Sequence, residues 1–219
     1  MKIAIITAGW RRAGVENVIK NLEKQTYKDW TEHIIVNDNS PEVRELFKEN
    51  DFWEKHPKRF CIDSHIRGGY YGAHARSTGA IMAFHHIKRN VMKDDKDWWI
   101  LFWDDDNNFY PDFLERMVKA HEENPEAVLL GANIEIRGKN DKNYKHLMKI
   151  KLHAQQCDLG CFLYKKEMFN KYSYFPAGER YKVSYDWEMI RKIADGEGHN
   201  KVYIDSEGGP GLIFYHKRR

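Results

Sequence analysis

The sequence contains no long apolar run. Its most strongly apolar stretch extends only from Trp98 to Trp103, whereas a membrane-spanning helix needs about 20 apolar residues. The first residues, MKIAIITAGW, lack the apolar region and the small-residue cleavage site of a signal peptide. We therefore expect a protein without a transmembrane segment that resides in the cytoplasm, with peripheral attachment to a membrane left open.

The sequence also has few cysteines and a small net charge. Three cysteines in 219 residues do not suggest a disulfide framework and favour reduced thiols. The 36 basic and 33 acidic residues give a net charge of +3, which argues against a general nucleic-acid binder, although a local basic patch for a phosphate group is compatible with it. We expect no nucleic acid among the partners.

Short apolar strands alternate with amphipathic helices up to residue 131. Strands are expected at Lys2–Thr7, His33–Asn37, Arg59–Asp63, Trp98–Trp103 and Ala127–Leu130, and helices at Val15–Lys24, Glu42–Asn50, Gly72–Asn90 and from Pro111 to about His121. This alternation predicts an α/β fold, a single Rossmann-like domain over residues 1–219 with a mostly parallel central sheet flanked by helices.

The pattern weakens after residue 131. The charged and aromatic stretch Lys139–Lys151 is compatible with a surface excursion or a β-hairpin. A helix is expected at Ser184–Ile193 and a strand at Lys201–Asp205.

Polar residues follow three of the expected strands. These ends are Thr7-Ala8-Gly9, Asn37-Asp38-Asn39-Ser40 and Asp104-Asp105-Asp106. Parallel strands place them at one edge of the sheet, where ligands bind in open α/β folds. Three adjacent carboxylates repel one another unless they are solvated or bind a cation, and their hard oxygen atoms suit Mg²⁺ or Mn²⁺. The alternative is a solvated turn that caps a helix.

Four other residues are candidates, each with a plainer alternative. Asp38 can accept a hydrogen bond from a base N–H or a ribose hydroxyl, or can form an Asx turn. Arg76, about one turn inside a helix that follows a glycine-rich turn, suits a phosphate or an ion pair. Asp186 is a candidate general base or a helix N-cap. His216 is a candidate metal ligand or an ordinary surface or core residue.

The order and spacing of these motifs resemble the inverting family 2 glycosyltransferases, which have the GT-A fold. The resemblance covers about residues 3–190. The matching segments are Ile3–Thr7, Val18–Lys24, Gln25–Trp30, Ile34–Ser40, Gly72–Gly79 with its Ala75-Arg76 pair, Phe102–Asn107 with the DXD element Asp104–Asp106, and Asp186-Trp187-Glu188. Two positions depart from the family pattern, because Asn37 and Tyr185 stand where acidic residues are usual.

The resemblance implies a metal-dependent enzyme that transfers a sugar from a nucleotide-sugar, with UDP as the expected nucleotide, to an acceptor hydroxyl with inversion. The acceptor would be a carbohydrate, a lipid-linked glycan or a protein-linked glycan. Residues 1–131 would bind the nucleotide-sugar, and residues 132–219 the acceptor.

The resemblance also implies a role for each candidate residue. Asp38 would hold the nucleobase with Thr7, Ala8 and Gly9 nearby, and Arg76 would lie near the nucleotide. Asp105 would reach the ribose or the sugar, and Asp106 would bind Mn²⁺ or Mg²⁺ together with Asp104 and His216. Asp186 would deprotonate the acceptor hydroxyl.

Two other functions compete with this interpretation. A nucleotidyltransferase that forms nucleotide-sugars would share the sheet and the carboxylates, and the segment Gly9–Gly14 partly matches its glycine- and arginine-containing phosphate loop. A catalytically decayed carbohydrate- or nucleotide-binding module could use the abundant aromatic residues, 14% of the chain, to stack on sugars.

Overall fold

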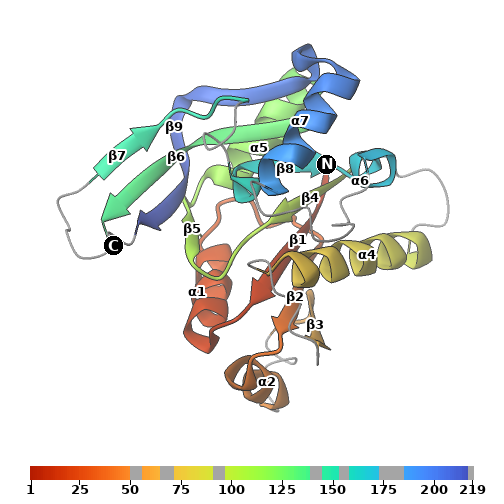
Figure 1. Cartoon of the computed structure of the whole chain (residues 1–219), viewed down its shortest axis with the longest axis vertical. Coiled ribbons are helices and arrows are strands. Elements are labelled where there is room, and N and C mark those ends of the chain that lie inside the picture. The colour runs from red at the N-terminus through yellow and green to blue at the C-terminus, as the bar shows by residue number, and fades with distance from the viewer. Residues whose placement is uncertain are drawn as a thin grey trace. The chain divides into compact units, whose positions relative to one another are not determined.

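A computed structural model describes residues 1–49, 56–64, 72–90, 97–138, 145–152, 158–172 and 185–216 (Figure 1). The chain divides into two compact units. The first comprises Met1–Lys20 and Asp29–Asp105, and the second comprises Asn21–Lys28 and Asp106–Arg219. Each unit has its own strands.

The first unit is built on four parallel strands in the order β3 (Arg59–Ser64), β2 (Glu32–Asp38), β1 (Lys2–Gly9) and β4 (Trp98–Phe102). The strands β1, β2 and β4 are almost completely buried, as expected for parallel strands that are covered on both faces. Because all four run in the same direction, their carboxyl ends lie at one edge.

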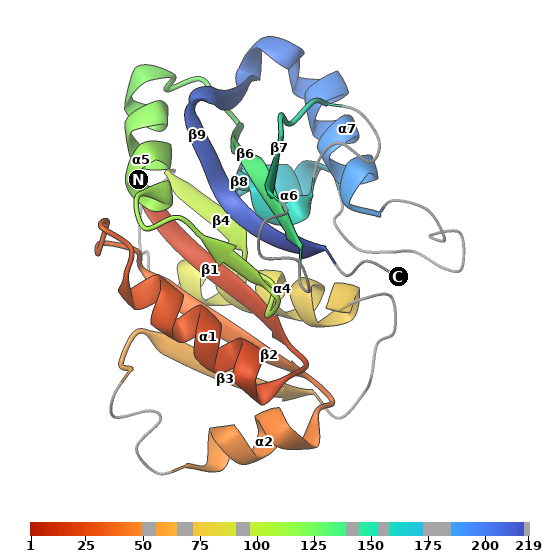
Figure 2. The ribbon, with the colours of Figure 1, turned by 90° about the vertical axis from the view of Figure 1, so that its left-hand side faces the viewer.

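Helices cover both faces of these strands. Successive strand residues point to opposite faces, so Ile35 packs with α1 (Arg12–Glu23) and α2 (Pro41–Lys48), whereas Ile34 and Val36 pack with α4 (Ala73–Asn90). Figure 2 shows α1 and α4 on opposite sides of β1. The apolar side chains on the α4 face are mostly small, and they are Ala4, Ala8, Ile34, Val36, Ala75, Ala83 and Trp98.

The second unit is built around β6 (Leu129–Gly138). The strand β9 (Val202–His216) runs parallel to it, whereas β8 (Phe162–Lys165) and β7 (Lys145–Met148) run antiparallel to it. The short strand β5 (Asn107–Phe109) pairs antiparallel with β9. The helices of this unit are α5 (Phe113–Glu123), α6 (Glu167–Tyr172), α7 (Tyr185–Glu197) and the short 3-10 turns η2 (Leu159–Cys161) and η3 (His199–Lys201).

The predicted α/β fold with a mostly parallel sheet is confirmed. The strands and helices expected before residue 131 are present with shifts of a few residues at their ends, except that the strand expected at Ala127–Leu130 is the much longer β6, Leu129–Gly138. Of the segment Lys139–Lys151, residues 139–144 lie outside the described part of the chain, and the described strand β7 pairs antiparallel with β6, as the hairpin alternative predicts. The sequence did not reveal β5 or β8, and β9 is much longer than the expected strand.

The chain passes from the first compact unit to the second between Asp105 and Asp106, and not at residue 131. The expected division of function at residue 131, with nucleotide-sugar binding before it and acceptor binding after it, stays a prediction. Among the helices that the structure describes, none is both long and apolar enough to cross a membrane.

Candidate functional site

The carboxyl edge of the first unit gathers most of the predicted site residues. In the ladder between β1 and β2, Gly9 pairs with Asn37, so Asp38 comes next to the end of β1. On the other side of β1, the N–H of Trp103 donates to the carbonyl of Ile6 at 2.8 Å, and Asp104 follows directly. The structure thus brings Ala8, Gly9, Asp38 and Asp104 to the same edge.

Asp38 is the most unusual side chain at this edge. It is 7% exposed, and its Oδ1 atom has no hydrogen-bond partner among the described residues. The turn after β2 is closed by its neighbour, because the Asn37 side chain accepts from the N–H of Ser40 at 2.7 Å and donates to Asp63 at 2.7 Å. A buried carboxylate oxygen without a donor costs free energy, so Asp38 suits a ligand that supplies an N–H or O–H group.

Arg76 forms an ion pair with Asp104, with 2.7 Å between Nη1 and Oδ1. The arginine is buried near the N-terminus of α4. Gly72 has a φ of +80°, and a Cβ atom on it would lie 3.1 Å from the Cβ of Ala8, so a glycine there lets the start of α4 approach the end of β1. The Arg76 guanidinium and the helix N-terminus both favour an anionic group at this edge.

Asp105 anchors the turn between β1 and α1. Its carboxylate accepts from the backbone N–H groups of Trp10 and Arg11 at 3.0 and 2.8 Å, and from the Arg11 guanidinium at 2.5 Å. The start of α1 also packs tightly here, because a Cβ atom on Gly14 would lie 2.4 Å from the carbonyl oxygen of Asp105. The expected contact of Asp105 with ribose or sugar stays a prediction. Sequence reasoning missed the role of Arg11, since these partners are 94 residues apart.

Thr7 belongs to a buried network instead of facing the edge with its hydroxyl. His33 Nε2 lies 2.8 Å from Thr7 Oγ1, and Arg59 Nε donates to His33 Nδ1 at 3.3 Å. Because Nδ1 accepts, Nε2 carries the proton and donates to Thr7. Burial, together with the nearby charges of Arg59 and His56, holds the pKa of His33 well below its usual range. The Thr7 hydroxyl is therefore engaged with His33, and Thr7 contributes only its backbone to the carboxyl end of β1.

In the second unit, Asp106 is exposed and directly precedes β5. The ladder between β5 and β9 pairs Asn107 with Phe214. One further step of this antiparallel register would bring Asp106 opposite Tyr215, with His216 as the next residue. The side chain of His216 lies outside the described part of the chain. No group of three or more His, Cys, Asp or Glu side chains that could hold a metal occurs among the described residues.

The predicted general base, Asp186, is the second residue of α7, so the expected helix is present. The side chain of Asp186 is not among those that the structure describes. Its predicted role as a general base or as a helix cap therefore stays a prediction.

Glu135 is a nearly buried carboxylate in the half of the chain expected to bind the acceptor. It forms ion pairs with Arg137 of the same strand and with Lys145 of β7, the latter at 2.7 Å. Burial acts to raise the pKa of Glu135, but hydrogen bonds with Lys145, Arg137 and Tyr110 outweigh it and lower the pKa. The cluster ties β7 to β6.

Comparisons with known proteins give a consistent answer. The model of the family described as glycosyl transferase family 2 matches residues 4–181. No curated protein matches the chain. Similar solved structures include S. aureus TarS 1-349 and its complex with UDP-GlcNAc, both 14% identical, with TM-scores of 0.67 and 0.69. They cover 98% and 100% of this chain, which spans 60% of the TarS chain in each case.

The likeness to these structures concerns the fold, whereas the family model matches the sequence itself over most of its length. The matched residues, 4–181, include most of the first three strands, the aspartates after β4 and a large part of the second unit. The resemblance noted from the sequence motifs is therefore confirmed, and the chain belongs to glycosyl transferase family 2.

Proposed function

We propose that this glycosyltransferase transfers a sugar from a UDP-sugar to an acceptor hydroxyl, with inversion at the anomeric carbon and with Mn²⁺ or Mg²⁺ as cofactor. The observation that carries the proposal is the buried Asp38 carboxylate, whose Oδ1 has no partner among the described residues. It lies at the same edge as the ion pair between Arg76 and Asp104. A nucleotide offers this edge both a donor for the carboxylate and phosphates for the cationic group.

The chemistry of Asp38 favours uracil over cytosine. Uracil presents an N–H group at ring position 3, which can donate to a carboxylate, whereas cytosine presents a lone pair there and would repel it. The solved structures of TarS in complex with UDP and with UDP-GlcNAc share the fold of this chain. They support a uridine nucleotide as the donor.

The residues after β4 fit a metal site with few protein ligands. Asp104 contacts Arg76, and Asp105 contacts the start of α1. Asp106 is exposed and directly precedes β5, which pairs with β9, the strand that ends at His216. Magnesium-type sites commonly use only one or two carboxylates in addition to substrate phosphates, so Asp106, Asp104 and His216 would hold the cation. A divalent cation there would stabilise negative charge on the departing diphosphate.

Asp186 is proposed as the general base. It would accept the proton of the acceptor hydroxyl while that oxygen attacks the anomeric carbon on the face opposite the diphosphate, and a direct attack of this kind inverts the configuration. A positioned base of this type contributes roughly 10²–10⁴-fold to the rate.

Nucleotide binding tests the donor site directly. Thermal unfolding is measured with UDP, CDP, GDP and ADP, each with and without Mn²⁺. A ligand at about 100 times its dissociation constant stabilises a fold by about 2.7 kcal/mol, which corresponds to roughly 5–10 °C for a chain of this size. We expect this shift for UDP with Mn²⁺ only. An equal shift for CDP would contradict the role of Asp38, and no shift with any nucleotide would contradict the proposed donor site.

Variants separate metal binding from proton transfer. Asp106→Ala is expected to lose the Mn²⁺-dependent UDP shift. Asp186→Asn is expected to keep that shift while sugar transfer falls by roughly 10²–10⁴-fold. Glu188→Gln is the matched control, because Glu188 lies on the same helix two residues further on and therefore on a different face. Wild-type transfer by Asp186→Asn would exclude Asp186 as the base.

A further inference from the structure

The turn after β2 contains two neighbouring side chains that could close it, Asn37 and Asp38. An aspartate in a turn commonly accepts a hydrogen bond from the N–H group two residues further on, which for Asp38 is the N–H of Ser40. In this structure that N–H donates instead to Asn37 Oδ1 at 2.7 Å. The buried Oδ1 of Asp38 has no hydrogen-bond partner among the described residues. Asn37 thus occupies the donor that would otherwise hold the Asp38 carboxylate.

The Asn37 amide is held in this orientation by Asp63 of β3. The two residues are paired in the parallel ladder between β2 and β3. Asn37 Nδ2 donates to Asp63 Oδ1 at 2.7 Å and to the Ser40 carbonyl at 3.1 Å. An ionised carboxylate only accepts and a backbone N–H only donates, so the amide nitrogen faces Asp63 and the amide oxygen faces the Ser40 N–H. An aspartate at position 37 could not satisfy both partners, because its ionised side chain has no group that donates.

Arg44 of α2 fixes Asp63 in turn. Its Nε donates to Asp63 Oδ2 at 2.7 Å, and its Nη2 donates to Asn39 Oδ1 at 3.2 Å. Asn39 has a φ of +57°, a left-handed conformation that asparagine adopts more readily than most residues. The contacts from Arg44 through Asp63 to Asn37 therefore hold the turn without using Asp38 Oδ1.

This network and the Asp38 carboxylate belong to opposite faces of the strands. Successive residues of a strand point to opposite faces. Asn37 contacts Asp63 on the side of α2. Asp38 alternates in step with Val36, which packs on the side of α4, the helix that carries Arg76. Asn37 can therefore close the turn without covering the Asp38 carboxylate.

We propose that Asn37, oriented by Asp63, is a positioning residue for nucleobase recognition: it closes the turn after β2 in place of Asp38 and so keeps the Asp38 carboxylate available to the N–H group of uracil. This inference rests on the proposed function, because it assumes that Asp38 binds the base. It also gives a physical reason for the neutral residue at position 37, where the family pattern has an acid. Next to Asp63, an amide avoids the repulsion between two adjacent carboxylates.

The test measures the dissociation constant of UDP by calorimetric titration in the presence of Mn²⁺. Asn37→Ala removes the amide without adding a charge and leaves the Ser40 N–H to Asp38. Asn37→Asp places a second carboxylate beside Asp63. Ser40→Ala is the matched control in the same turn, because it removes only the hydroxyl that accepts from the Val43 N–H at 3.4 Å and caps α2, while the Ser40 N–H stays in place.

An exchange variant tests the pairing of the two side chains. Asn37→Asp combined with Asp63→Asn moves the carboxylate to position 37, where it accepts from the Ser40 N–H, and moves the amide to position 63. The new amide donates to position 37, and its oxygen can still accept from Arg44. The net charge equals that of the wild type.

We expect Asn37→Ala and Asn37→Asp to raise the dissociation constant of UDP by roughly 10–100-fold, as for the loss of one hydrogen bond to a charged group. The exchange variant should recover most of this affinity. Ser40→Ala should lower Tm but keep the wild-type dissociation constant. Wild-type affinity in Asn37→Ala would overturn the inference, as would an exchange variant that binds UDP no better than Asn37→Asp, or an equal loss of affinity in Ser40→Ala.

A second comparison shows whether Asn37 acts through Asp38. In the Asp38→Ala background, Asn37→Ala should change the dissociation constant of UDP little further, because the carboxylate that it affects is absent. Independent, multiplicative effects of the two substitutions would contradict the inference. Wild-type UDP affinity in Asp38→Ala itself, or a wild type that does not bind UDP, would instead refute the proposed function.

Discussion

The buried network of Thr7, His33 and Arg59 makes the stability of the first unit sensitive to pH. The His33 ring is completely buried, and burial with the charges of Arg59 and His56 lowers its pKa well below the usual value. In the unfolded chain the same ring titrates at about 6.5. Below that pH the unfolded chain binds a proton that the folded protein excludes, so acid favours unfolding.

The size of the effect follows from this linkage. The stabilisation from a neutral His33 is fully present above a pH of about 6.5 and is lost as the pH falls toward the pKa of the folded state. A single group of this kind lowers the free energy of unfolding by up to about 1.4 kcal/mol per pH unit. Between about pH 7.5 and about pH 5.5 the loss is about 1.4 kcal/mol, or roughly 3–6 °C in Tm for a chain of this length.

His33→Gln isolates the contribution of the ring. The glutamine amide can donate to Thr7 and accept from Arg59 as the neutral ring does, but it does not titrate. Urea unfolding of both proteins at about pH 7.5 and about pH 5.5 should show a loss that is larger in the wild type by about 1.4 kcal/mol. Equal losses in the two proteins would refute the assignment of a neutral buried His33, because every other titrating group is shared.

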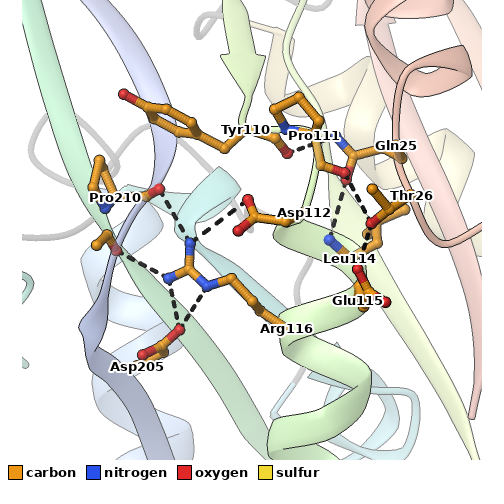
Figure 3. A network of polar contacts seen from close by, with 11 residues as sticks. Gln25, Thr26, Tyr110, Pro111, Asp112, Leu114, Glu115, Arg116, Asp205 and Pro210 are labelled. Carbon is orange, nitrogen blue, oxygen red and sulfur yellow. Dashed lines mark hydrogen bonds and ion pairs between the residues drawn. The ribbon is translucent and has the colours of Figure 1, made fainter.

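Three other perturbations address the segments around the site. Gly14→Ala would push a Cβ atom against the Asp105 backbone. Thermal unfolding should show that the free energy of unfolding falls by about 1–3 kcal/mol, and UDP binding should weaken. An unchanged Tm would contradict the close approach of Gly14 to Asp105. Gln25→Leu would remove the amide that bridges the Tyr110 carbonyl and the Leu114 N–H (Figure 3). We expect urea unfolding to show that the free energy of unfolding falls by about 2 kcal/mol; an unchanged value would contradict the importance of this bridge. Chelation with EDTA should abolish sugar transfer and added Mn²⁺ should restore it, whereas full activity in EDTA would exclude the proposed cofactor.

The strands and helices of the first unit could be predicted because their signals are local. The run from Trp98 to Phe102 is apolar at every position and is buried throughout, as a central parallel strand should be. The alternation of strands and helices then required the carboxyl ends of these strands to share an edge. Asp38 and Asp104 were therefore found at the same edge from the sequence alone.

The partners of the polar side chains could not be predicted in this way. Arg11 contacts Asp105 across 94 residues of sequence, and Arg116 contacts Asp205 across 89. No periodicity connects such pairs, since they meet only after the elements have packed. The short strand β5 was missed for a related reason, because three residues carry little local signal and its pairing with β9 supplies the missing information.

The sequence by itself determined the α/β class, the family and the edge at which the acidic residues emerge, because these depend on hydrophobic periodicity and on the order of motifs along the chain. Only the tertiary structure decided what each polar residue does there. It assigned Asp105 to the turn before α1, Thr7 to a buried network and Asp104 to Arg76, and it left Asp38 with an oxygen that has no partner among the described residues. The physical reason is that hydrogen bonds and ion pairs act over about 3 Å, and distances of that size between remote residues are set by packing and not by local sequence.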